Sequence, residues 1–115
     1  MRLKYLFVIV DKIKTRKVTE ALIECGANAL NVIPGTGTAP TALGDILGTG
    51  ESSKSVITAT IEERYMEGVE RCLKDKFEFG VKRGAGVAFT VPVKAVAGPA
   101  TLRILAGECA EEETK

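Results

Sequence analysis

The sequence contains no histidine among its 115 residues. Histidine is the commonest protein ligand for zinc and the commonest general base in catalysis. Its absence argues against a zinc site and removes Ser–His and Cys–His pairs as ways to activate a nucleophile. We therefore expect no metal site and no catalytic residue, and we interpret the chain as a regulatory or binding protein that is not an enzyme.

Cysteine is also scarce, with only Cys25, Cys72 and Cys109. An odd number of widely spaced cysteines without a Cys-x-x-Cys pair does not make a disulfide framework. No apolar run reaches the roughly 20 residues that cross a bilayer. The apolar start of the chain is followed by Asp11 and Lys12 where a signal peptide has small residues for cleavage. These absences indicate a cytoplasmic protein.

Aromatic residues make up only 5% of the sequence, and the formal net charge is only +1. Domains that bind RNA on a sheet stack bases on aromatic side chains, and binding through bulk charge needs a strongly basic surface. No segment alternates aromatic and basic residues as such domains do. We therefore expect no nucleic-acid partner.

The chain does contain alternating strand and helix patterns, which predict one domain over residues 1–107. Strands are predicted at 3–10, 28–33, 55–61 and 87–93, and helices at about 15–25 and 62–76. This order is that of an α+β, ferredoxin-like β-α-β-β-α-β sandwich, an antiparallel sheet with two helices on one face. Residues 98–107 can add a short strand, and the acidic tail 108–115 is expected to be disordered.

Local signals predict where these elements begin and end. Thr15 is expected to cap the first helix, and Thr60 with Glu63 has the spacing of a capping box for the second. Pro34 is expected to end the second strand together with the glycine that follows it. Pro92 lacks an N–H group, so the last strand is expected at a sheet edge.

The first strand has apolar side chains on both faces. They are Leu3, Tyr5, Phe7 and Ile9 on one face, and Leu6, Val8 and Val10 on the other. Because the helices cover only one face of this sheet, the other face must be kept from water by something else. Further copies of the same sheet would do so, and we predict a closed homo-oligomer.

A basic glycine turn, "GVKRGAG" at residues 80–86, precedes the last strand. Gly84 and Gly86 permit positive φ angles, and successive N–H groups in such a turn can bind an anion. Lys82 and Arg83 add positive charge beside them. A solvated connection between helix and strand is the alternative interpretation, because glycine is ordinary in turns.

A second glycine-rich segment, residues 35–54, begins with "GTGTAP" and shows no clear periodicity. It is not a phosphate-binding P-loop, because no Gly-Lys-Ser/Thr ends it. Connections of this length are usually functional or mobile. Asn31 and Thr58 are polar residues inside apolar strands, and they either contact a ligand or are satisfied by neighbouring backbone.

Together, "TEALIECGANALNV", the segment 35–54 and "GVKRGAGVAFTVPV" resemble the PII signalling family over nearly all of residues 3–98. The segment 35–54 resembles a shortened T-loop, the arm that contacts target proteins, and 80–86 resembles the B-loop. The resemblance implies a homotrimer that binds an adenine nucleotide in clefts between subunits and regulates a partner protein through the mobile loop.

The resemblance also implies a set of contact residues. Around the phosphates it places Lys82, Arg83, Gly84, Ala85, Gly86 and Val87. The base of the loop contributes Gly35, Thr36 and Gly37, and the strands surround base and sugar with Ile9, Leu30, Asn31 and Thr58. The loop residues for partner binding are Thr38, Ala39, Pro40, Leu43, Ile46, Leu47, Glu51 and Lys54.

Three departures from the family pattern modify these expectations. Val87 stands where family members carry a lysine on the phosphates, and only Arg103 follows the last strand where arginines are usual. We therefore expect ADP or AMP, in preference to ATP, as an effector, and no tightly bound cofactor.

Residues 35–54 contain no tyrosine, so uridylylation is not expected. Nitrogen regulation through 2-oxoglutarate is then in doubt, and a transporter and a metabolic enzyme are both candidate targets.

Two other functions remain open. One is a trimeric ferredoxin-like scaffold of the CutA type that binds a metal or another small anion without sensing a nucleotide. The other is an enzyme resembling ferredoxin-like acylphosphatases. That enzyme would need an arginine in an N-terminal anion loop and a catalytic asparagine, and neither pattern is convincing in this sequence.

Overall fold

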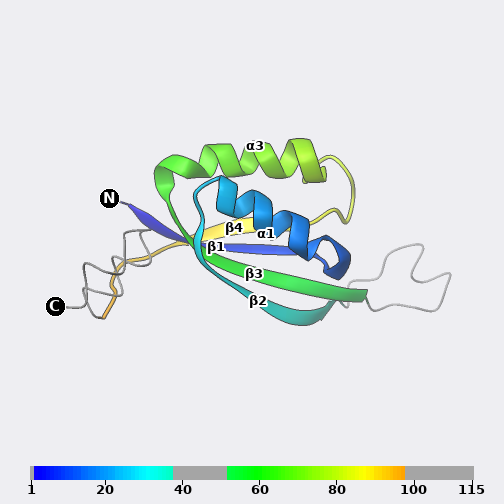
Figure 1. Ribbon diagram of the computed structural model, residues 1–115, viewed down its shortest axis with the longest axis horizontal. Coiled ribbons are helices and arrows are strands. Elements are labelled where there is room, and N and C mark those ends of the chain that lie inside the picture. The colour runs from blue at the N-terminus through cyan, green and yellow to red at the C-terminus, as the bar shows by residue number, and fades with distance from the viewer. Residues whose placement is uncertain (1, 38–51, 98–115) are drawn as a thin grey trace.

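A computed structural model describes residues 2–37 and 52–97 (Figure 1). The elements, in chain order, are β1 (Leu3–Asp11), η1 (Lys12–Lys14), α1 (Thr15–Glu24), β2 (Asn28–Gly37), β3 (Ser52–Glu62), η2 (Glu63–Tyr65), α3 (Met66–Phe77) and β4 (Val87–Pro92). The strands form an antiparallel sheet in the order β2-β3-β1-β4, and Figure 1 shows α1 and α3 on the same face. This confirms the predicted α+β, ferredoxin-like arrangement.

The core lies between the two helices and the central strands β1 and β3. Alternate residues of each strand point toward the helices, as the twofold repeat of a strand requires. The fully buried side chains are Leu6, Val8 and Val10 of β1, Ile57, Ala59 and Ile61 of β3, Val18 and Leu22 of α1, and Val69 and Leu73 of α3. The helix-covered half of the sheet is thus a dry, aliphatic layer.

The predicted cap of the first helix is wrong. Thr15 is the first residue of α1, and Lys14 before it already has helical backbone angles. Because the turn η1 leads directly into the helix, the Thr15 hydroxyl lies too far along the helix to cap it. It donates its one proton to the Lys12 carbonyl at 2.8 Å and accepts a hydrogen bond from the Ser55 hydroxyl at 2.6 Å, which ties the start of α1 to β3.

The predicted capping box of the second helix is also wrong. Glu62 is still extended and pairs with Leu3 in the β1–β3 ladder, so Thr60 lies inside β3 and not before a helix. Its hydroxyl donates to the Asn28 carbonyl at 3.2 Å. Regular helix begins at Met66, after η2, four residues beyond the predicted start.

Strand β2 continues past Pro34 to Gly37, so the predicted strand end at Pro34 is wrong, and the first three residues of the glycine-rich segment 35–54 are extended. Gly35, Thr36 and Gly37 pair with Lys54, Ser53 and Ser52 of β3. Because β2 is an edge strand, alternate N–H groups point away from the sheet, and a proline at such a position removes no ladder bond. The same reasoning placed β4 at an edge from Pro92, and β4 pairs with β1 alone among the described strands.

Candidate functional site

The sheet face without helices carries a cluster of partly exposed apolar side chains. Tyr5, Phe7 and Ile9 of β1 lie opposite Val91, Phe89 and Val87 of β4, in that order. The rings of Phe7 and Phe89 stack with centroids 5.0 Å apart, and Tyr5 meets Phe7 edge to face, also at 5.0 Å. Phe89 remains 48% exposed and Val91 46% exposed. Contiguous exposed apolar surface of this kind marks an interaction site.

The basic glycine turn and the described ends of β2 and β3 lie at the same end of the sheet. Ile9 pairs with Val87 on one side and with Val56 on the other, and Val56 pairs with Ile33. These four residues form a row across the sheet. The turn 80–86 leads directly into Val87, at one end of the row, whereas β2 and β3 extend beyond the row to Gly37 and back to Ser52. Figure 1 shows the α3–β4 connection and the open ends of β2 and β3 on one side of the molecule. Two of the expected ligand-binding segments are thus brought together.

Within the turn, the backbone adopts left-handed conformations that favour glycine. Gly80 has φ +75°, Gly84 has φ +78° and Gly86 has φ +154°. Lys82 and Arg83 are exposed, whereas Ala85 is 3% exposed and its N–H donates to the Lys82 carbonyl at 3.2 Å. The Ala85 amide, which belongs to a residue expected near the phosphates, is therefore engaged inside the turn.

Gly86 has a packing role that the sequence did not reveal. A Cβ atom at this position would lie 2.4 Å from Phe79 Cζ and 2.9 Å from the Ile9 carbonyl oxygen. Only glycine lets the turn close over the Phe79 ring and against β1. Gly84, in contrast, has no atom within 4 Å of where a Cβ would be. Gly84 is therefore the glycine whose replacement probes an anion site without disturbing the packing.

The strand residues expected to surround a ligand divide between the two faces. Asn31 pairs with Thr58, which also pairs with Phe7, so these residues share the helix-free face. The Thr58 side chain is 3% exposed, and Asn31 Nδ2 donates to the Ala29 carbonyl at 3.3 Å. Leu30 packs against the helix-covered core, so it does not lie with Asn31 and Thr58.

The expected partner-binding residues fall largely outside the described part of the chain. Those outside it are Thr38, Ala39, Pro40, Leu43, Ile46, Leu47 and Glu51. Lys54 is described, and its ammonium group pairs with the Asp11 carboxylate across the β1–β3 ladder. Its charge is thus matched at the base of the segment that joins β2 to β3.

A cleft between α3 and β4 borders the glycine turn. Its lining is mostly apolar and consists of Glu70, Leu73, Lys74, Phe79, Gly80, Gly86, Val87 and Ala88. Phe79 and Gly86 therefore contact this cleft as well as each other.

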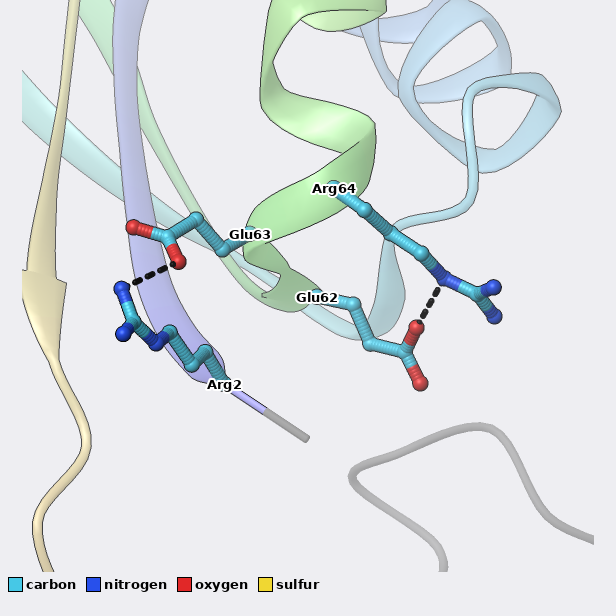
Figure 2. Close-up of a pocket in the computed structure, with 4 residues that line it drawn as sticks. All are labelled: Arg2, Glu62, Glu63 and Arg64. Atoms are coloured by element: carbon cyan, nitrogen blue, oxygen red, sulfur yellow. Dashed lines mark hydrogen bonds and ion pairs between the residues drawn. The ribbon is translucent and has the colours of Figure 1, made fainter.

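A second cleft, drawn in Figure 2, lies at the opposite end of β1. Its four lining side chains are charged and pair with one another, Arg2 with Glu63 at 3.3 Å and Arg64 with Glu62. None of the expected site residues lines it. Since each carboxylate already faces a guanidinium and the pairs are solvent-exposed, we interpret it as a surface ion-pair cluster.

The described residues can be searched directly for a metal site and for a helix that could span a membrane. Among residues 2–37 and 52–97, no group of three or more Cys, Asp or Glu side chains is placed to hold a metal ion. Within the same ranges, no helix is long and apolar enough to cross a membrane.

No protein-family model matches the sequence, and no curated protein is similar to it. The structural neighbours are PII and PII-like signalling proteins. One is CPII, a nitrogen regulatory PII-like protein from Thiomonas intermedia K12, with ADP, AMP and bicarbonate bound. Its TM-score is 0.65 with 17% identity, covering 85% of this chain and 97% of that chain.

Two further structures have the same fold. Arabidopsis thaliana PII bound to citrate matches with a TM-score of 0.64 and 19% identity, covering 87% of this chain and 85% of that chain. A PII-like protein from Thermus thermophilus matches with a TM-score of 0.62 and 15% identity, over 85% and 93% of the two chains. At these identities the likeness establishes the fold.

Proposed function

We propose that this chain is a cytoplasmic, non-enzymatic PII-like regulatory protein. In this proposal it assembles as a homotrimer, binds ADP or AMP at the seam between subunits, and regulates a target protein through the segment between β2 and β3. The target is a transporter or a metabolic enzyme. The fold supports the proposal, and so does the presence of ADP and AMP in a structural neighbour.

The main support for the proposed homotrimer is the apolar, helix-free face of the sheet. In a single subunit the stacked pair Phe7 and Phe89, with Val87 and Val91 beside it, stays in contact with water. Burying apolar surface stabilises an interface by about 25 cal/mol per Å². Packing this face against other copies removes the exposed cluster, and it also forms seams beside the glycine turn.

The glycine turn supplies the groups that an anion requires. Lys82 and Arg83 are exposed, and neither forms an ion pair with any described residue, so both charges are available to a ligand. Gly84 adds backbone that a phosphate can approach closely. The first residue of the strand that follows is the apolar Val87, which offers no charge to a third phosphate. ADP and AMP therefore fit the turn better than ATP does.

The test is calorimetric titration of AMP, ADP and ATP into the wild-type protein and two variants, Gly84→Asp and Gly84→Asn. Aspartate and asparagine both tolerate left-handed backbone and have the same size, so they differ mainly in charge. We expect Gly84→Asp to weaken nucleotide binding at least tenfold, about the contribution of one charge-assisted hydrogen bond. Gly84→Asn adds the same side-chain bulk without the charge, so it should weaken nucleotide binding less than Gly84→Asp does.

The outcomes separate the candidate functions. Wild-type affinity in both variants would remove the turn from the site, and tighter binding of ATP than of ADP would contradict the preference for fewer phosphates. The anion-binding scaffold of the CutA type predicts heat with citrate or bicarbonate and none with a nucleotide. Citrate and bicarbonate are included because they occur in the neighbouring structures.

A further inference from the structure

The connection from β1 to α1 carries a concentrated positive charge. Lys12, Lys14, Arg16 and Lys17 lie within six residues, around Ile13. Ile13 is 89% exposed, more than any other large hydrophobic side chain in the described residues, and no residue of η1 is buried. We call residues 12–17 the basic shoulder. Its isoleucine contributes nothing to the core and stands in solvent between cations.

Other exposed cations lie at the same end of the sheet. The turn 80–86 closes against β1 beside Ile9, only two residues before the end of that strand. This turn carries Lys82, Arg83 and Val81, and Val81 is 67% exposed. Figure 1 shows η1 and the α3–β4 connection on the same side of the molecule. The end of the sheet therefore presents two cation-flanked apolar side chains, although the whole chain has a net charge of only +1.

Little of this charge is neutralised by other residues that the structure describes. Arg16 pairs with Glu20 at 3.3 Å, whereas Lys12, Lys14 and Lys17 form no ion pair with any described residue. Lys17 lines a cleft with Lys76 of α3, and Glu20 and Glu24 are the acidic side chains there. The shoulder thus keeps an excess of positive charge facing outward.

The charge also opposes the preference of the helix that it precedes. A helix N-terminus is electrostatically positive and favours acidic residues, yet the first turn of α1 contains none and carries Arg16 and Lys17. Since this arrangement does not stabilise the helix, the folded subunit does not explain it. An anionic surface outside the subunit does explain it.

We infer that the basic shoulder docks on anionic phospholipid at a membrane surface. Ile13 would enter the boundary between headgroups and acyl chains, while Lys12 and Lys14 keep their ammonium groups at the phosphates. A lipid surface fits better than an acidic protein, because Ile13 and Val81 are single exposed side chains on separate connections. Anionic headgroups attract such basic segments, at about 1 kcal/mol for each lysine or arginine.

This docking would bring the ends of β2 and β3 toward the membrane, since both lie at the same end of the sheet as η1. The inference does not depend on nucleotide binding. Residues 12–17, which the test changes, are not among those proposed to hold the nucleotide, so either proposal can fail while the other stands.

The test is co-sedimentation of the full-length protein with vesicles of phosphatidylcholine alone and with vesicles containing phosphatidylglycerol. We expect binding only to the anionic vesicles, and weaker binding at higher salt. Replacing both Lys12 and Lys14 by Gln should lower the partition coefficient about thirtyfold, from about 1 kcal/mol for each lysine. The matched control is Arg71→Gln with Lys94→Gln, which changes net charge equally at exposed positions away from the shoulder and should leave partitioning unchanged.

The apolar contribution is tested with Ile13→Ser. We expect about a tenfold loss of partitioning, the lower range for burying an isoleucine side chain. Ile23→Ser, at an exposed position near the other end of α1, is the control and should bind as the wild type does. Three results would overturn the inference: equal binding to both vesicle types, full binding by the shoulder variants, or binding to an acidic protein or a DNA duplex without binding to vesicles.

Discussion

At the scale of single residues, the two described cysteines show how neighbours change reactivity. Burial raises the pKa of the Cys25 thiol, and the neighbouring Cys72 thiol raises it further. The thiolate is the reactive form, so a raised pKa leaves less of it at neutral pH. We expect alkylation of Cys25 by iodoacetamide at neutral pH to be slower than that of the same cysteine in the unfolded chain. Peptide-resolved mass spectrometry measures both rates.

Removing Cys72 tests whether its thiol contributes to the raised pKa of Cys25. In Cys72→Ala the midpoint of the alkylation rate against pH should move to lower pH, because one contribution that raises the pKa of Cys25 is gone. A change in access alone would scale the rate at every pH and leave the midpoint in place. An unchanged midpoint would therefore contradict the influence of Cys72.

At the scale of elements, the end of α3 is closed by a residue in an unfavourable conformation. Glu78 has φ +60°, and its N–H donates to the Lys74 carbonyl, while the Phe79 N–H reaches the Leu73 carbonyl. Left-handed backbone costs an L-residue about 1–2 kcal/mol, and glycine adopts it freely. We expect Glu78→Gly to raise the free energy of unfolding by about 1 kcal/mol in urea titrations.

The matched control for this prediction is Asp75→Gly, three residues earlier and inside α3. Glycine is less favourable than aspartate within a helix by a few tenths of a kcal/mol, about the difference between their helix propensities, so this variant should be slightly less stable than the wild type. If Glu78→Gly were also destabilising, the left-handed backbone would not be the controlling factor at this helix end.

At the scale of the whole molecule, the helix-free face determines the proposed assembly. Phe89→Glu puts a carboxylate into the stacked cluster with Phe7, and burying an unpaired charge at an interface is strongly unfavourable. We expect light scattering to show a trimer for the wild type and a monomer for this variant. Phe89 is 48% exposed in the single chain, so the subunit should still fold, which circular dichroism checks.

Ile23→Glu serves as the control for assembly. Ile23 is 58% exposed and lies on α1, on the side of the sheet away from the proposed interface, so this variant should keep the wild-type mass. Retention of the wild-type mass by Phe89→Glu would show that this face does not hold the subunits together.

The local pattern of apolar and polar residues was sufficient to predict the fold and the position of the basic turn 80–86. The alternation of Leu6, Val8 and Val10 with Tyr5 and Phe7 indicates a sheet that needs cover on both faces, because successive side chains of a strand point to opposite sides. A single proline was informative where the residue's own backbone limits decide the outcome, as Pro92 was for the edge strand.

Contacts between residues far apart in the sequence decided the rest. Thr15 and Thr60 were expected to cap helices, but their hydroxyls form hydrogen bonds with Ser55 and with the Asn28 carbonyl, both on other elements. The strict need for glycine at position 86 comes from the Phe79 ring and the Ile9 carbonyl. Hydrophobic pattern and secondary-structure propensity describe which conformation a residue prefers given its neighbours in the sequence. The partners that meet it across the sheet exist only once the strands have paired, so they determine the caps, the strand ends and the shape of the candidate site.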